Sequence, residues 1–152
     1  MQYWLMKSEP EVFGISHLKT SPRRSAMWDG VRNYQARNML RDEFKKGDLA
    51  FFYHSSCEEP GIVGIMEILC AGYPDPTAFM RAHIHHDPKS LRESPRWFTV
   101  DVKLKQEFKR LISLTEMRTV LALADMVILR RGNRLSITPV TPEHWNLVLK
   151  IV

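Results

Sequence analysis

Hydrophobic and polar residues are arranged along the N-terminal third in a pattern that predicts one strand and one well-marked helix. An aromatic and apolar strand is expected over Gln2–Met6, and Pro10 prevents its ladder pairing from continuing. Apolar residues at helical spacing predict a helix over Asn33–Lys46, with Asn33 as its N-cap and Gly47 after its end. Between them, a short helix capped by Ser16 is expected over Ile15–Lys19.

The middle of the chain has the pattern of a strand hairpin followed by an irregular segment. Leu49–His54 and Ile62–Leu69 are apolar runs separated by a polar turn, so we expect them to pair as antiparallel strands. Residues 71–96 contain four prolines and no clear periodicity. A segment of this length without regular structure in a compact domain is usually functional. Alternation then returns and predicts a half-buried strand over Trp97–Leu104.

The C-terminal third begins with a capping box at Ser113–Glu116, which predicts a helix to about residue 124. Short strands are expected over Met126–Leu129 and Leu135–Val140. A final amphipathic helix is expected over residues 142–151, with Thr141 as its N-cap and Pro142 at its first position. This order is mixed α/β without βαβ alternation. It favours a small, curved mixed β-sheet or pseudo-barrel surrounded by helices, with residues 1–152 forming a single domain.

Composition limits the classes of protein to be considered. The chain has 152 residues, of which 44% are hydrophobic and 26% charged, values typical of a globular protein. No apolar run is long enough for a transmembrane helix, and the N-terminus has no leader pattern. We therefore expect a cytoplasmic protein, or a nuclear one in a eukaryote. Two cysteines are too few for a disulfide framework.

Net charge points to a polyanionic partner. The formal charge is +5, and the sequence pI is near 9.4; an excess of this sign favours contact with phosphate groups. The basic residues also gather in three clusters, each of which could equally be a solvated face. The candidates for phosphate contact are Arg23, Arg24, Lys103, Lys105, Arg130, Arg131 and Arg134.

Signs of catalysis are missing. The sequence has no serine between glycines of the nucleophile-elbow kind and no glycine-rich phosphate loop. A group of His83, His85, His86 and Asp87 is the one metal-like cluster, but no second ligand set is visible, and a solvated loop is the preferred interpretation. We therefore predict no catalytic residue, no cofactor and no metal.

One tryptophan stands apart from the apolar runs. Trp28 lies in a polar connection before a helix, followed by Arg32 and Asn33. The alternative interpretation is core filling. An aromatic face for stacking, with an amide or guanidinium for hydrogen bonds, is the minimum needed to hold an extruded base.

Longer motifs resemble the EVE domain family. Residues 3–10 (YWLMKSEP) and 28–38 (WDGVRNYQARN) are similar to the family's first two signatures, and further likeness follows at 47–64, 73–79, 97–102 and 134–145. The resemblance covers essentially the whole chain in order. It implies a PUA-like fold related to the YTH readers of methylated adenine in RNA.

By the same analogy, Trp28 is expected to stack on a modified base while Ser8 and Asn33 form hydrogen bonds at its edge. The residues expected around the base are Lys7, Ser8, Glu9, Trp28, Arg32, Asn33, Tyr53, His54, Ser55 and Phe79. One segment departs from the family. Where its members often have a tyrosine pair, this chain has His85-His86, which lowers the aromatic content and raises the positive charge of the loop.

The sequence thus predicts a binding module, and not an enzyme, that recognises a modified base in DNA or RNA by extruding it into an aromatic pocket. A monomer is favoured. Three alternatives stay open: a nucleoside or small-molecule sensor on the same fold, an accessory enzyme of nucleic-acid modification, and an interaction scaffold in which the pocket residues are core. Binding of an oligonucleotide weakens steeply with salt, whereas binding of a nucleoside does not.

Overall fold

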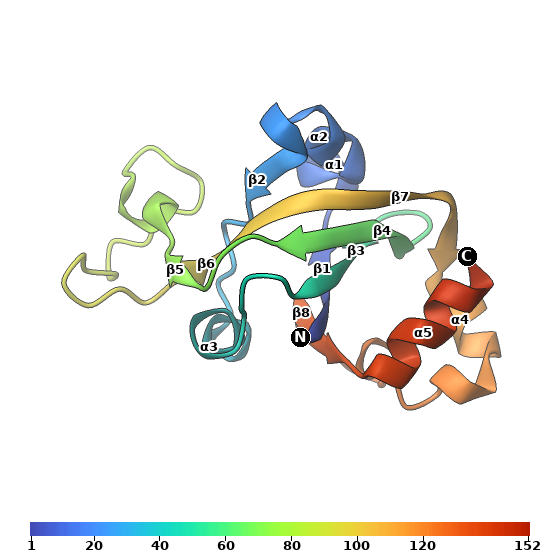
Figure 1. The fold of residues 1–152 in the computed structure, drawn as a ribbon. Helices are drawn as coiled ribbons and strands as arrows, with labels where there is room; N and C mark the ends of the chain where they lie inside the picture. The colour runs from blue at the N-terminus through green and yellow to red at the C-terminus, as the bar shows by residue number, and fades with distance from the viewer.

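A curled six-stranded sheet forms the centre of the molecule, in the strand order β2-β7-β4-β3-β1-β8 (Figure 1). The computed structural model describes residues 1–152. The strands of this sheet are β1 (Tyr3–Ser8), β2 (Ser25–Met27), β3 (Leu49–His54), β4 (Gly61–Ile68), β7 (Asp101–Ser113) and β8 (Ile137–Val140). A separate two-stranded sheet pairs β5 (Tyr73–Pro74) with β6 (Phe98–Thr99).

Helices lie at both sides of the sheet (Figure 1). The α-helices are α1 (Pro10–Phe13), α2 (Ile15–Thr20), α3 (Tyr34–Asp42), α4 (Leu114–Thr119) and α5 (Pro142–Ile151). The 3-10 helices are η1 (Pro22–Arg24), η2 (Pro76–Phe79), η3 (Leu121–Leu123) and η4 (Val127–Leu129). None of these helices combines the length and the hydrophobicity that crossing a membrane requires. The curled mixed sheet with its flanking helices agrees with the mixed α/β architecture expected from the sequence.

Strand pairing follows the predicted hairpin. β3 and β4 are antiparallel, whereas β1 runs parallel to β3 and antiparallel to β8. The pairing of β4 with β7 shifts register twice. Such irregularities increase local twist and bend a strand, which lets the sheet curl. The N-caps predicted at Asn33, Ser113 and Thr141 are confirmed: their side-chain oxygens accept bonds from Ala36 N, Glu116 N and His144 N. The cap predicted at Ser16 was wrong, because α2 begins one residue earlier, at Ile15, with Gly14 as its N-cap.

Two separate hydrophobic cores cover the two faces of the sheet, because successive side chains of a strand point to opposite faces. On β3, Phe52 belongs to the core that also contains Trp4, Trp28 and residues of α3. Its neighbours Phe51 and Tyr53 belong to the other core, which α5 covers with Trp145. The rings of Phe51 and Trp145 stack with centroids 3.9 Å apart.

Several predicted boundaries were wrong. The helix expected over Asn33–Lys46 ends at Asp42, since the chain turns so that Phe44 stacks on Trp4, with centroids 4.3 Å apart. The helix that opens at the Ser113 capping box ends at Thr119, and a turn at η3 follows.

Three strand predictions also need correction. Residues 126–129, expected to be a strand, form η4, in which Leu129 N and Arg130 N donate to carbonyls three residues before them. The strand expected over Trp97–Leu104 is divided between β6 and β7, and β7 continues to Ser113. The short edge strand β2 was missed because three half-buried residues give too little alternation to detect.

Candidate functional site

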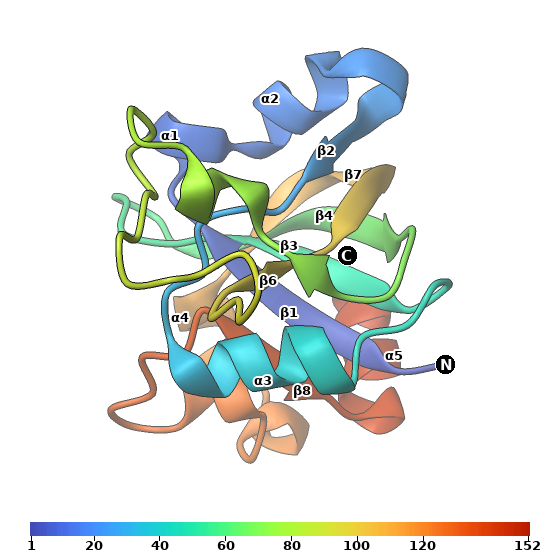
Figure 2. The ribbon, with the colours of Figure 1, turned by 90° about the vertical axis from the view of Figure 1, so that its left-hand side faces the viewer.

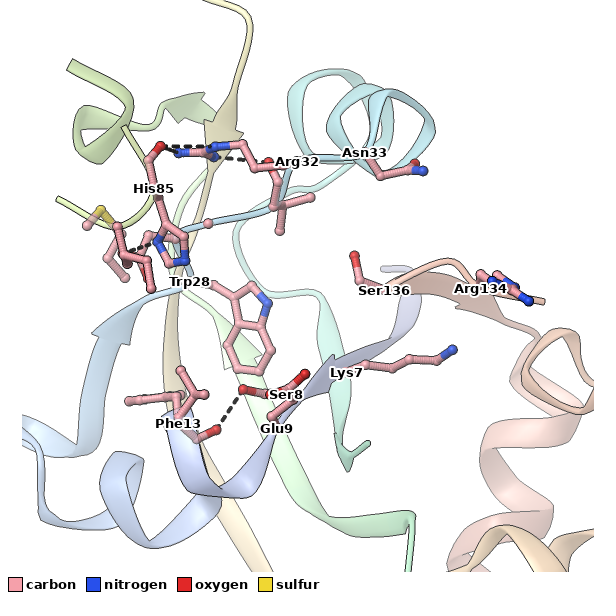
Figure 3. A pocket seen from close by; sticks show the side chains of 16 residues that line it. Lys7, Ser8, Glu9, Phe13, Trp28, Arg32, Asn33, His85, Arg134 and Ser136 are labelled. Atoms are coloured by element: carbon pink, nitrogen blue, oxygen red, sulfur yellow. Dashed lines mark hydrogen bonds and ion pairs between the residues drawn. The ribbon is translucent and has the colours of Figure 1, made fainter. Parts of the chain in front are cut away.

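A cavity of about 490 Å³ opens where the end of β1, α1, the connection before α3 and the 80–86 loop meet (Figure 3). Figure 2 looks onto this side of the molecule, where the yellow-green segment after η2 lies between α1 and α3. The lining residues are Lys7, Ser8, Glu9, Val12, Phe13, Met27, Trp28, Asp29, Gly30, Val31, Arg32, Asn33, Ile84, His85, Arg134 and Ser136.

The first wall is built where β1 ends. Ser8 Oγ donates to the carbonyl of Phe13 at 2.7 Å, which folds α1 back over the strand end and places the Phe13 ring in the cavity wall. Lys7 N donates to Ser136 O at 2.8 Å and joins this wall to the segment before β8. Burial lowers the pKa of the Lys7 ammonium, because the charged form loses hydration there.

Trp28 forms the floor of the cavity. It is 6% exposed and lies edge-on to Phe13 and Phe52, with centroids 6.0 and 5.2 Å away. Its backbone is fixed by a bond from Trp28 N to Val100 O at 2.8 Å. The indole nitrogen lies on the ring edge that faces Lys7 and Ser136 (Figure 3). Trp28 is thus both a core residue and the floor of the cavity.

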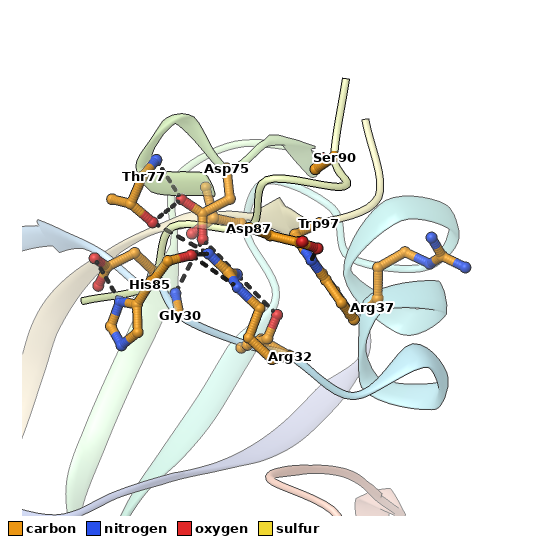
Figure 4. Close-up of polar contacts among 12 residues, drawn as sticks. Gly30, Arg32, Arg37, Asp75, Thr77, His85, Asp87, Ser90 and Trp97 are labelled. Atoms are coloured by element: carbon orange, nitrogen blue, oxygen red, sulfur yellow. Dashed lines mark hydrogen bonds and ion pairs between the residues drawn. The ribbon is translucent and has the colours of Figure 1, made fainter. Parts of the chain in front are cut away.

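The second wall depends on an ion pair between the buried Asp75 and the partly exposed Arg32 (Figure 4). Asp75 is fully buried and accepts hydrogen bonds from Gly30 N, from Thr77 and from Arg32 Nη1 at 3.0 Å. Burial by itself would raise the pKa of Asp75, but the bonds from Thr77, Gly30 and Arg32 outweigh it, so the pKa is lowered. Arg32 Nη2 also donates to His85 O at 2.7 Å. Arg32 therefore holds the 80–86 loop against the cavity.

The loop brings two histidines to one carboxylate. Asp29 Oδ2 lies 3.4 Å from His85 Nδ1 and 3.7 Å from His83 Nε2. The His85 Nδ1 atom is buried and the alignment falls short of a hydrogen bond. His83 Nδ1 accepts from His85 N at 3.0 Å, so in the neutral ring the proton is on Nε2, which faces Asp29 as a donor.

These three side chains also have the composition of a metal site, which the sequence did not predict because Asp29 is far from the histidines along the chain. A metal at His83 Nε2 requires the proton on Nδ1, where it would displace the bond from His85 N. We therefore interpret the group as electrostatic support for His85. Gly30 is required beneath it, since its φ is 83° and a Cβ there would overlap the His85 ring.

Six of the ten residues expected around a base do line the cavity: Lys7, Ser8, Glu9, Trp28, Arg32 and Asn33. Three of them have other partners already, and Ser8 is one, because its hydroxyl donates to the Phe13 carbonyl. Arg32 binds both Asp75 and the His85 carbonyl, a set of contacts called the Arg32 bracket below. Asn33 Oδ1 caps α3.

The other four expected residues lie outside the cavity: Tyr53, His54, Ser55 and Phe79. Tyr53 points to the opposite core, because it follows Phe52 on a strand. His54 Nε2 accepts from Ile15 N at 3.1 Å, and Ser55 N donates to Ser8 O. Phe79 packs under the guanidinium of Arg92, 4.9 Å from its ring centroid.

Among the basic candidates, only Arg134 lines the cavity. Arg23 and Arg24 lie in η1, Lys103 and Lys105 on β7, and Arg130 and Arg131 after η4, all exposed. Sequence reasoning missed several lining residues, namely Phe13, Met27, Val31, Ile84, His85 and Ser136. Only the departure at His85-His86 gave a signal in the sequence, since no local pattern announces which loops meet in space.

The sequence was compared with known protein families. The EVE domain family matches residues 2–151. This chain belongs to the EVE domain family. Thymocyte nuclear protein 1 of Mus musculus is 45% identical over 98% of this chain and 73% of its own length. The protein of the same name from Danio rerio is 44% identical over 97% of this chain and 71% of its own length.

Solved structures of EVE domain relatives have the same fold. A protein from Pseudomonas putida is 46% identical, with a TM-score of 0.93 and 98% of both chains covered. The human THYN1 protein, solved in complex with DNA containing 5-methylcytosine, is 45% identical, with a TM-score of 0.93 over 99% of this chain and 97% of that chain. The EVE family and the PUA-like architecture predicted from the motifs are both confirmed.

Proposed function

We propose that this EVE domain is a non-catalytic DNA-binding module that receives an extruded 5-methylcytosine in the cavity over Trp28. The observation that carries the proposal is the cavity itself: a buried tryptophan edge surrounded by polar groups, on the fold that a relative uses in a complex with 5-methylcytosine DNA. Its volume of about 490 Å³ is in the range of small-ligand sites.

The apolar part of the lining suits a methylated ring. Phe13, Met27 and Val31 lie in the wall beside Trp28. Removing one methyl group from water is worth about 0.8 kcal/mol, and a methyl that fills an apolar space adds dispersion contacts to that. These walls distinguish a methylated base from an unmethylated one by a modest factor, so most of the affinity must come from other groups.

The polar groups match the edge of cytosine, which has acceptors at O2 and N3 and a donor at the amino group N4. Lys7 Nζ and the indole N–H of Trp28 are donors on one side of the cavity (Figure 3). His85 Nδ1 lies 3.4 Å from the Asp29 carboxylate, and this negative charge favours the neutral tautomer with its proton on Nδ1, which leaves Nε2 as an acceptor. His85 is then the partner of the amino group.

Positively charged side chains at the cavity mouth favour binding of the phosphates of the extruded nucleotide. Lys7 and Arg134 both line the cavity, and Arg134 is exposed. We propose these two as the phosphate contacts nearest the base. The other basic candidates, Arg23, Arg24, Lys103, Lys105, Arg130 and Arg131, would contact DNA only if it runs well beyond the cavity.

The rival functions have weaker support. For an enzyme that uses a nucleophile, Ser8 is poorly placed, because its hydroxyl donates to the Phe13 carbonyl and not to a base that could activate it. A nucleoside sensor would use the same cavity without its basic rim. Neither alternative gains from a specific observation, so both are outcomes of the test.

The test is a titration of fluorescent DNA that is identical except for one 5-methylcytosine or cytosine, at several salt concentrations. We expect binding that is roughly tenfold tighter with the methyl group and that weakens steeply with salt. Equal binding of both DNAs would contradict the proposal. Salt-independent binding of the free nucleoside would establish the sensor, and a change in DNA mass would establish the enzyme.

A further inference from the structure

One side chain at the cavity mouth is apolar and almost fully in solvent. Ile84 is 89% exposed, yet it is among the residues that line the cavity. A single exposed apolar residue is ordinary on a protein surface. Its place matters here, because a base that enters this cavity must leave its stack beside this residue.

The loop holds Ile84 rigidly at the tip of a turn. On one side His83 N donates to Met80 O at 2.9 Å, and on the other the carbonyl of His85 accepts two bonds from Arg32. The bond from His85 N to His83 Nδ1 closes the turn beneath the tip. An isoleucine is itself stiff, since its branched Cβ limits χ1. The backbone on both sides of Ile84 is therefore held by hydrogen bonds, and the branched Cβ leaves the exposed side chain few rotamers.

We propose that Ile84 is a wedge that enters the base stack of duplex DNA at the site from which the modified base is extruded. Proteins that distort DNA often insert Ile, Leu, Met or Phe between bases, and extrusion leaves an apolar gap that such a side chain fills. The inference rests on the proposed function and extends it: the module acts on paired DNA and takes part in opening it.

The experiment compares Ile84→Ala with Leu121→Ala as the matched control. Leu121 is 88% exposed, similar to Ile84, but lies on η3 and does not line the cavity. Both side chains are in solvent, so neither change affects folding. Each variant and the unaltered protein are titrated with 5-methylcytosine DNA in two forms, a fully paired duplex and the single strand, each with 2-aminopurine beside the modified base to report unstacking.

We expect Ile84→Ala to weaken binding of the duplex about tenfold, equal to about 1.4 kcal/mol, and to abolish the rise in 2-aminopurine fluorescence. Binding of the single strand should change less than twofold, because no stack has to be opened, and Leu121→Ala should match the unaltered protein. Equal loss on duplex and single strand would overturn the wedge and make Ile84 part of the pocket wall. No loss on the duplex would overturn it as well. Failure of the unaltered protein to bind either form would refute the proposed function, and this inference with it.

Discussion

Apolar and aromatic residues pack on both faces of the sheet, but a helix covers one face and a cavity lies open over the other. On one face Trp145 stacks on Phe51, and α5 closes the core. On the other, Trp28 packs edge-on against Phe13 and Phe52 beneath an open cavity. The two tryptophans are almost equally buried, at 3% and 6% exposure.

The difference teaches that burial alone does not distinguish a tryptophan inside a core from one that borders a cavity. Their surroundings do. Trp145 has apolar neighbours on the sheet and within its own helix, whereas Trp28 shares its cavity with Lys7, Asn33 and His85. On the open face, the Arg32 bracket holds the 80–86 loop beside the cavity. The closed face is covered by α5 instead.

Removal of the bracket should have the largest effect. Arg32→Ala leaves the buried Asp75 carboxylate without its cation, and since Arg32 is itself partly exposed, we expect a loss of about 3 kcal/mol in the free energy of unfolding. The released loop should also abolish DNA binding. Chemical denaturation measures the first effect and DNA titration the second.

The matched control for that change is Arg110→Ala on the side of the closed core. Arg110 forms a two-point ion pair with Glu116 and also donates to the Ile151 carbonyl, but neither partner of the ion pair is buried. We expect its loss to lower the free energy of unfolding far less than the Arg32 change does, because water screens an exposed ion pair. Equal destabilisation by the two changes would show that the bracket is not special.

Exchange of each tryptophan for phenylalanine should separate the two faces by function. Trp28→Phe keeps an apolar ring but removes the indole N–H and part of the wall, so we expect 5-methylcytosine DNA to bind at least about tenfold more weakly, equal to about 1.4 kcal/mol. Trp145→Phe should cost some stability and leave binding within twofold. If the two variants bind alike, the cavity over Trp28 is not the base site.

Loss of the rim cation should have a smaller effect. Arg134→Gln removes one phosphate contact, so we expect a few-fold weaker binding and a salt dependence whose slope falls by about one. Arg130→Gln, at an exposed arginine outside the cavity, serves as the control. A larger effect of Arg130→Gln would move the DNA path toward the clusters that lie away from the cavity.

The smallest expected effect is on stability at acidic pH. Burial lowers the pKa of His54 below its ordinary 6.5, and its Nε2 accepts from Ile15 N only while neutral. Below pH 6.5 the unfolded chain binds this proton before the folded chain does, so stability falls as the pH drops through the window between the two values. Thermal unfolding between pH 7.5 and 5 should show a flatter decline for His54→Gln, and an unchanged decline would exclude His54 as a source.

Much of this protein was determined by its sequence alone. The helix N-caps at Asn33, Ser113 and Thr141 follow from local chemistry, since a side-chain oxygen satisfies a backbone N–H three residues away. The β3–β4 hairpin follows from two apolar runs joined by a polar turn. The motifs at residues 3–10 and 28–38 identified the family, and they contain all six of the expected base-site residues that line the cavity.

Tertiary structure decided the rest. The direction of Tyr53 away from the cavity depends on the register of β3, which one residue reverses. The use of Arg32 as a bracket depends on Asp75, more than forty residues later, and the position of His85 and Ile84 depends on that bracket. Contacts between segments so distant along the chain leave no periodic pattern, because they form only when the packed sheet brings the loops together.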